Sequence, residues 1–237
     1  MYRGLKHLKK KKRVLIATDS RGAGIQQQIN RNQKLASLDD IKIDIRIIPG
    51  AKVNEIHTAI KTACTYHTYD LILVIGGICN LTDRVQWCGL QLLDYSSKDL
   101  QEVKGQFVSI REQYASKVIF ATIPPASLMK YGQVKNRLED LPKHIEVSLA
   151  RKQRRLEKDL KLVNNWIRQN NKAYQATNLD LNKINTSNSI KRDINGVRYR
   201  KESFTAKNLY DGLHANMKLK EKWHKRTTDV IYQEMSK

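Results

Sequence analysis

The sequence predicts a three-layer α/β/α fold, in which helices cover both faces of a mostly parallel sheet of about five strands. Four short runs rich in valine and isoleucine predict strands, and these runs lie at 13–18, 41–48, 71–77 and 117–123. Helical patterns separate the runs along the chain. Alternating strands and helices are typical of parallel βαβ units with right-handed crossovers.

Helices are predicted where apolar residues recur at steps of three and four. In the first half of the chain this pattern occurs at 22–36, 52–66 and 98–114. The strand at 71–77 is apolar almost throughout, as expected for a central strand that is covered on both faces. Pro124 follows the last of the four strands and ends it, because proline cannot donate to a sheet ladder.

The second half of the chain predicts a long helix, a fifth strand and a hairpin. An apolar stripe runs along the predicted helix at 143–170, and the fifth strand is expected at 173–180. Residues 181–208 are polar and basic, and they contain Asn195-Gly196, a strong signal for a two-residue hairpin turn. A helix from Asn216 onward closes the chain.

Length and composition indicate one domain. With 237 residues, the chain is expected to have a basic arm at 1–12 and a single domain at 13–237, with the basic insertion at 181–208. No apolar stretch approaches the ~20 residues that span a bilayer. The N-terminus has no apolar region behind its charges, so a secretory signal is not expected either.

The cysteines favour a reducing compartment. Cys64, Cys79 and Cys88 are odd in number and lack metal-ligand spacing. This pattern predicts reduced thiols in an intracellular protein, cytoplasmic or nuclear, with no metal and no other cofactor. The sequence carries no indication of an oligomeric state.

The formal net charge is +21, and a chain this basic tends to bind polyanions. RNA or DNA is therefore an expected partner, with an anionic membrane surface as another. The alternative is that the charges form a solvated terminus and solvated helix surfaces. The candidate contacts are Lys9, Lys10, Lys11, Lys12 and Arg13 in the N-terminal run, Arg151, Arg155 and Lys158 on the long helix, and Arg198 and Arg200 in the hairpin.

Three residues suggest nucleophilic catalysis. Ser20 ends an apolar run, at the place where open α/β sheets bind their ligands. Asp211 and His214 are three residues apart, so a tight turn can direct both side chains to one side. Together they could supply a nucleophile, a base and the base's partner. The alternative is structural, since serine and aspartate are also common helix caps.

Four short blocks, in this order, resemble those of the SGNH (GDSL-type) hydrolases. TDS at 18–20 resembles the first block, GDS, and Gly50 corresponds to the glycine of the second. The segment LILVIGGICN at 71–80 resembles the third block, which usually reads GxND. DGLH at 211–214 matches the last block, DxxH.

This resemblance implies an SGNH hydrolase or flavodoxin-like fold and an ester substrate. It implies that Ser20 is the nucleophile, that His214 is the base and that Asp211 orients the base. It also implies an oxyanion hole formed by the backbone amides of Ser20 and Gly50 and the side chain of Asn80. Of the remaining polar residues, Asp19 is expected to be a structural hydrogen-bonding residue, and His57, His67, His144 and His224 are expected at the surface or satisfied in the core.

The third block departs from the family pattern. If Gly77 is its glycine, Asn80 lies one residue late, and a one-residue bulge is expected to bring it into place. If Gly76 is its glycine, Ile78 occupies the position of the asparagine and the side-chain donor is lost. In the first block, Thr18 replaces the usual glycine.

Two functions remain open on this sequence. The first is a serine esterase that removes an acyl group, such as acetyl, from an alcohol or sugar hydroxyl. The second is a catalytically weak or inactive module on the same fold that binds RNA or DNA. The resemblance includes both the retroelement-encoded esterases and the Oskar C-terminal-like branch, which binds RNA. Intact Ser20, Asp211 and His214 favour catalysis, whereas the charge favours a polyanion.

Overall fold

Four parallel strands form the centre of the molecule. The computed structural model describes residues 11–32, 41–85, 89–114, 117–136, 143–192, 194 and 198–237. The strands β1 (Lys12–Thr18), β2 (Ile41–Ile47), β3 (Leu71–Ile75) and β6 (Lys117–Phe120) lie in the order β2-β1-β3-β6. Every neighbouring pair is parallel, so the carboxyl ends of the strands meet at one edge of the sheet.

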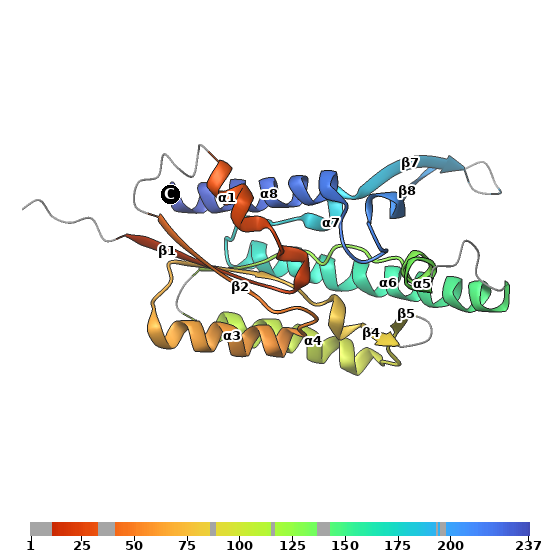
Figure 1. The fold of residues 1–237 in the computed structure, drawn as a ribbon, viewed down its shortest axis with the longest axis horizontal. Coiled ribbons are helices and arrows are strands. Elements are labelled where there is room, and N and C mark those ends of the chain that lie inside the picture. Colours follow the sequence, from red (N-terminus) through yellow and green to blue (C-terminus); the bar gives the residue numbers. More distant parts are fainter. Residues whose placement is uncertain are drawn as a thin grey trace, which may run out of the picture.

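Helices cover both faces of this sheet (Figure 1), which confirms the predicted three-layer fold. One face carries α3 (Val53–Tyr66), α4 (Ser97–Gln113) and α6 (Lys143–Ala173). The other face carries α1 (Ile25–Arg31) and α8 (Met217–Met235). Among the described residues, no helix is both long enough and apolar enough to cross a membrane.

Successive side chains of a strand point to opposite faces of the sheet. In the central strands the side chains on both faces are apolar. In β1, Leu15 and Ala17 join the core under α3 and α4, whereas Val14 and Ile16 join the core under α8. All four side chains are fully buried, as are the central residues of β3. This explains the continuous apolar runs of β1 and β3. The edge strand β2 alternates instead, with Ile41, Ile43 and Ile45 packed against the core under α8 and with Lys42 and Arg46 exposed.

The segment predicted as a fifth strand, 173–180, does not form one. The helix α6 extends through the start of this segment and ends at Ala173. Gln175, two residues later, has a left-handed backbone with φ +52°. Only Leu179 then pairs with the sheet, through an isolated parallel bridge to Ala121.

Two buried asparagines of α6 take the place of a fifth strand. Asn171 accepts a hydrogen bond from the Phe120 amide (3.2 Å) and donates one to the Phe120 carbonyl (2.7 Å). Asn164 does the same for Ile123, with distances of 2.6 Å and 2.9 Å. Side chains thus satisfy the outer backbone groups at the end of β6, where a strand ladder would otherwise be needed.

The predicted helix at 22–36 is shorter than expected. A 3-10 turn, η1 (Ser20–Gly22), precedes α1, and residues 33–40 lie outside the described residues. The sequence analysis also missed elements that are too short to show a period. These are β4 (Thr82–Val85), β5 (Gly89–Leu92), α5 (Leu128–Asn136), α7 (Leu181–Ile184) and the 3-10 turns η2 (Ile78–Asn80) and η3 (Ala206–Asn208).

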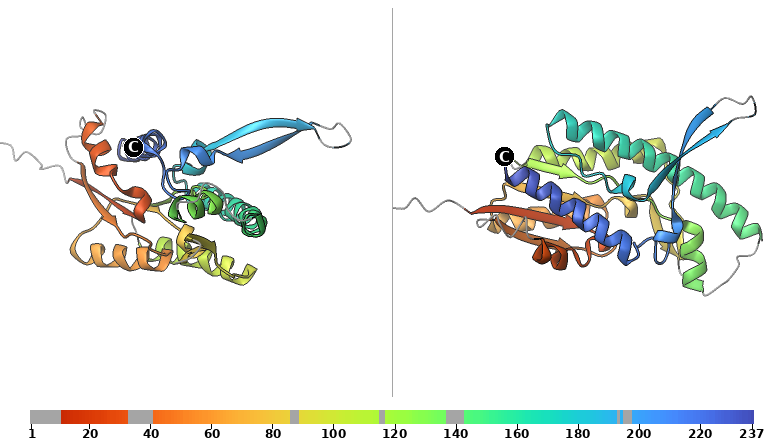
Figure 2. Two further views of the ribbon diagram at one scale, coloured as in Figure 1. Left: turned by 45° about the vertical axis from the view of Figure 1, so that its right-hand side comes forward. Right: turned by 90° about the horizontal axis from the view of Figure 1, so that it is seen from above.

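The predicted basic hairpin is confirmed. Strands β7 (Thr186–Arg192) and β8 (Arg198–Phe204) pair antiparallel along their whole length. The Asn195-Gly196 turn itself lies outside the described residues. Both views of Figure 2 show that this two-stranded ribbon projects away from the layered body.

We predict that Asn171→Leu destabilises the fold. Leucine has a similar volume but leaves the amide and the carbonyl of Phe120 buried and unsatisfied, and each such group costs about 1–3 kcal/mol. Urea denaturation should therefore show a loss of roughly 2–6 kcal/mol. Gln169→Leu, at an exposed position of the same helix, is the control. Equal stability of the two variants would contradict the role given to Asn171.

Candidate active site

The residues singled out in the sequence gather at the carboxyl edge of the sheet. Ser20 follows β1 and Gly50 follows β2. Thr18, the last residue of β1, pairs with the last residues of both β2 and β3, so the three loops begin at one level. Asn80 lies in η2, in the loop after β3. The DGLH loop, residues 211–214, precedes α8.

Two hydrogen bonds connect Ser20, His214 and Asp211. Ser20 Oγ lies 2.9 Å from His214 Nε2, and His214 Nδ1 lies 2.8 Å from Asp211 Oδ2. Asp211 is buried, whereas Ser20 and His214 are partly exposed. With a proton on Nδ1, the imidazole donates to the carboxylate and its Nε2 accepts from the hydroxyl.

The local turn keeps Asp211 ionised. Burial raises the pKa of its carboxyl, but hydrogen bonds from the His214 ring and from the backbone amides of Leu213 and His214 outweigh burial. The pKa of Asp211 therefore lies well below its ordinary value. A carboxylate that stays charged near neutral pH can orient the imidazole and stabilise its protonated form.

Glycine is required inside the DGLH loop. Gly212 has a φ of +88°, and a Cβ there would lie 2.5 Å from the Ser127 carbonyl oxygen and 2.5 Å from the Tyr131 amide nitrogen. The Gly212 carbonyl accepts a hydrogen bond of 2.6 Å from the Ser127 amide. This close approach anchors the loop to the start of α5.

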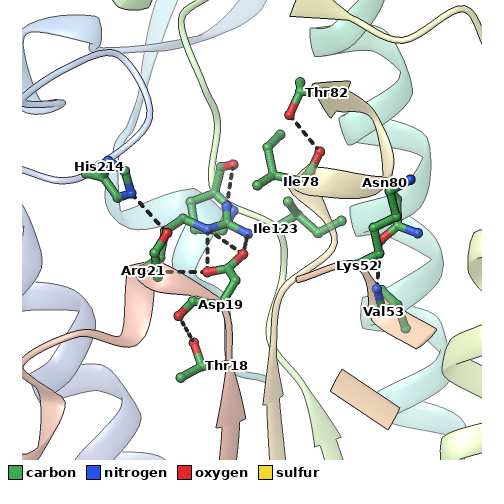
Figure 3. A network of polar contacts seen from close by, with 12 residues as sticks. Thr18, Asp19, Arg21, Lys52, Val53, Ile78, Asn80, Thr82, Ile123 and His214 are labelled. Atoms are coloured by element: carbon green, nitrogen blue, oxygen red, sulfur yellow. Dashed lines mark hydrogen bonds and ion pairs between the residues drawn. The ribbon is translucent and has the colours of Figure 1, made fainter. Parts of the chain in front are cut away.

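A buried ion pair underlies the nucleophile. The Arg21 guanidinium lies 2.7 Å from the Asp19 carboxylate, and the two side chains are only 2% and 1% exposed. Asp19 also accepts the Arg21 amide at 2.9 Å, which closes the 3-10 turn that begins at Ser20. A further contact of 3.4 Å joins Arg21 to the Pro124 carbonyl, after β6 (Figure 3). The structural role predicted for Asp19 is thus confirmed.

The sequence analysis gave Arg21 no role. Its position next to Asp19 and Ser20 was visible, but a charged residue in a glycine-containing loop is usually solvated. Only the tertiary structure reveals its burial. The Thr18 side chain also explains Gly22: a Cβ at Gly22 would lie 2.3 Å from the Thr18 Cγ2 atom, so no larger residue fits at position 22.

His224 supports the same turn from α8. It is buried, and it hydrogen-bonds the backbone of Arg21. Burial, together with the charge of Lys220, lowers the pKa of His224 to about 4, against the opposing effect of that hydrogen bond. His224 is therefore neutral near pH 7. It lies in the core, as one of the two alternatives for it predicted, but its buried Nε2 has no hydrogen-bond partner within the described part of the chain, so it is not fully satisfied.

Two backbone amides are available at the site. Within the described part of the chain, the amides of Ser20 and Gly50 donate no hydrogen bond to another protein group. Gly50 has a φ of +78°, a conformation that glycine adopts without strain. Both amides belong to loops that leave neighbouring strands at the same edge.

Asn80 is used within the fold. Its Oδ1 accepts a hydrogen bond of 3.0 Å from the Val53 amide, at the start of α3, and its Nδ2 lies 3.4 Å from Gln106 Oε1. Figure 3 shows the Asn80 amide directed at Val53, on the side away from His214. Gly77, with a φ of +109°, starts the 3-10 turn η2, which absorbs the extra residue without a bulge. The role of Asn80 as an oxyanion donor stays a prediction.

Three of the candidate nucleic-acid-binding cations form intramolecular contacts. Arg13 lies 2.9 Å from Asp44, and Lys12 donates to the Met235 carbonyl at 2.5 Å. Arg155 stacks on Tyr95 at 4.6 Å and donates to its carbonyl oxygen.

The other candidate cations are exposed or fall outside the description. Lys11, Arg151, Lys158 and Arg198 are exposed. Lys9, Lys10 and the side chain of Arg200 lie outside the described residues.

Two of the three cysteines lie in the part of the chain that the structure describes. Cys64 and Cys79 are free and partly buried, and burial raises the pKa of the Cys64 thiol. Cys88 lies outside the described residues. In the part of the chain that the structure describes, no three or more His, Cys, Asp or Glu side chains gather as metal ligands would.

Comparison with solved structures identifies relatives of this fold. The lipase/acylhydrolase from Enterococcus faecalis superposes with a TM-score of 0.60 at 14% identity, over 94% of this chain and 96% of that chain. The acetyl xylan esterase AlAXEase gives 0.58 at 13%, over 92% and 99%. A putative acylhydrolase from Bacteroides fragilis gives 0.57 at 15%, over 96% and 86%. No protein-family model and no curated protein matches the chain. Structural similarity at such low sequence identity shows that these proteins and this chain share a fold.

We predict that the ion pair between Asp19 and Arg21 is strongly coupled. Asp19→Asn leaves a buried guanidinium without its counter-charge, which should cost about 3–5 kcal/mol in urea denaturation. Adding Arg21→Met to Asp19→Asn should restore part of that loss, because no unpaired charge is left. The control is Asp94→Asn, which breaks an exposed contact of 3.9 Å with Arg155 and should cost less than about 1 kcal/mol. Simple additivity of the two substitutions would contradict the coupling.

Proposed function

We propose that this chain, which has the SGNH hydrolase fold, is a serine esterase that removes an acyl group such as acetyl from an alcohol or sugar hydroxyl. The observation that carries the proposal is the hydrogen-bonded path from Ser20 Oγ through both nitrogens of His214 to the Asp211 carboxylate. The structurally similar proteins include acylhydrolases and an acetyl xylan esterase, which supports a carboxylic ester as the substrate of this chain.

In the first half of the reaction, the Ser20 hydroxyl attacks the ester carbonyl carbon while its proton passes to His214 Nε2. The carbonyl electrons move onto oxygen and give a tetrahedral oxyanion. When this intermediate collapses, the bond to the leaving alcohol breaks and His214 returns the proton to the departing oxygen. Asp211 stabilises His214 while it carries the positive charge. The product is an acyl ester of Ser20.

In the second half, water takes the place of the alcohol. His214 accepts a proton from the water as the water oxygen attacks the acyl carbon of the Ser20 ester. Collapse of the second tetrahedral intermediate breaks the bond to Ser20 Oγ, which recovers its proton from His214. The carboxylic acid leaves, and the site returns to its starting state.

The oxyanion is assigned to the free amides of Ser20 and Gly50. Preorganised backbone donors of this kind stabilise charge that develops in the transition state. Asn80 is the proposed third donor. Its Nδ2 carries two hydrogens, and only one is directed at Gln106.

We predict that the wild-type protein hydrolyses p-nitrophenyl acetate and reacts with a fluorophosphonate probe. Ser20→Ala and His214→Ala should each lower kcat by about 10⁶, because the nucleophile and its base act as a unit. The matched control is Ser109→Ala, at an exposed serine of α4. Wild-type turnover no faster than that of Ser20→Ala would refute the enzyme proposal.

Asn80→Ala separates the oxyanion assignment from the rest of the mechanism. Loss of one oxyanion donor should lower kcat by about 10²–10³ and leave fluorophosphonate labelling detectable. A rate equal to that of wild type would show that the oxyanion is held without Asn80, while Ser20 and His214 keep their roles.

The charge favours a second function, binding of RNA or DNA. The net charge is +21, and exposed cations include Arg151 and Lys158, which are seven residues apart on α6. This function does not need the triad, so a catalytically weak or inactive module could perform it. The triad and the charge are compatible in one chain, because a basic surface can hold an enzyme on a nucleic acid.

We predict that removing residues 1–10 weakens binding to nucleic acid. The deletion stops before Lys12, the first residue of β1, so the melting temperature should not change. In a fluorescence anisotropy titration on duplex DNA, the slope of log affinity against log salt should flatten by about 0.9 for each phosphate contact that is lost. Absence of binding by the full chain at about 50 mM salt would refute this second function.

A further inference from the structure

The ribbon formed by β7 and β8 stands apart from the body of the protein. Its strands pair from Thr186 and Phe204 at the base to Arg192 and Arg198 at the far end. Figure 2 shows it extending outward in two directions of view. Seven residues in each strand, at about 3.4 Å per residue, give it a length of roughly 24 Å. An isolated two-stranded hairpin is marginal in water, so this extension needs a partner or an anchor.

The anchor lies at the base. The Thr205 amide donates to the Asn185 carbonyl at 3.0 Å, and Asn208 Nδ2 donates to the buried Asn185 side chain at 3.0 Å. The Asn208 carbonyl in turn accepts the Asn216 amide at 2.8 Å, next to the DGLH loop. The ribbon therefore has a fixed origin beside the candidate active site. Its far end has no such support among the described residues.

The far end carries like charges that face one another. Arg192 and Arg198 are direct cross-strand partners, and both are exposed. Like charges in this arrangement destabilise a sheet. A polyanion that contacts both guanidinium groups would turn this repulsion into attraction.

The far end of the ribbon also carries two exposed isoleucine side chains. Ile190 is 72% exposed and Ile194 is 101% exposed. Isoleucine at such positions gains nothing in the isolated protein, because its surface stays in water. Exposed apolar and basic side chains together favour a ligand that offers both phosphates and apolar surface.

We infer that the ribbon is an arm that enters the major groove of duplex DNA, an inference that rests on the proposed nucleic-acid function. The major groove is about 12 Å wide and admits a two-stranded ribbon, whose strands lie about 4.8 Å apart. Arg192 and Arg198 contact the phosphates or guanine edges. Ile190 and Ile194 contact apolar base edges such as the thymine methyl group. The deep, narrow major groove of duplex RNA does not admit such an element.

The test compares two variants of the full chain that carry the same net charge. Arg192→Gln/Arg198→Gln neutralises the far end of the ribbon. Arg31→Gln/Arg46→Gln neutralises two exposed arginines on α1 and β2. Each variant is titrated with duplex DNA, with one of its single strands and with duplex RNA of the same sequence, across a range of salt concentrations. Thermal melting confirms that each variant is folded.

The ribbon variant should bind duplex DNA at least tenfold more weakly than the control variant. Its salt slope should flatten by about 1.8, which is two contacts at about 0.9 each. The wild type should also protect guanine N7, which faces the major groove, from dimethyl sulfate, and the ribbon variant should not. Equal losses in the two variants, equal losses on all three nucleic acids, or absence of N7 protection would overturn the groove inference and leave general nucleic-acid binding in place. Absence of binding by the wild type would overturn both.

Discussion

The buried contact between Asp19 and Arg21 is the constraint on which the geometry of the candidate site depends. Both side chains are almost completely removed from water, so each charge must be satisfied by the other and by nearby backbone. Burial of an ion pair adds little net stability, because desolvation offsets the attraction. Its effect is positional: it holds the Arg21 guanidinium inside the loop that carries Ser20. From there Arg21 also donates to the Pro124 carbonyl at 3.4 Å, which connects this loop to the one after β6.

The nucleophile and its base come from two loops that are anchored separately. The turn at Ser20 is held by the ion pair below it and by His224 from α8. The DGLH loop is held by the close approach of Gly212 to the start of α5. Ser20 and His214 are 194 residues apart in the chain, yet their side chains meet at 2.9 Å. That distance therefore reports the relative placement of α5, α8 and β1, and no local preference could produce it.

The sequence was sufficient for those parts of the fold in which one pattern decides the structure. Three of the four strands were predicted as apolar runs, because β1, β3 and β6 are buried on both faces, and β2 was predicted from isoleucines that alternate with polar residues at the edge of the sheet. The proposed fifth strand failed because Asn164 and Asn171, on a helix, satisfy the backbone of β6. Asparagine in a helix is normally read as a solvated residue, so its pairing with a strand edge could not be seen before the tertiary structure was known.

The same limit applies to charge. Ser20, Asp211 and His214 were found because their spacing carries the chemistry, whereas Arg21 was missed because burial alone gives it a role. Composition states that the chain has a net charge of +21 but cannot distinguish a free cation from one used in the fold. Lys12 and Arg155 belong to the second kind. The cations that can contact a partner are those that are exposed and form no intramolecular contact. In the ribbon, two exposed arginines, Arg192 and Arg198, lie directly opposite each other on neighbouring strands.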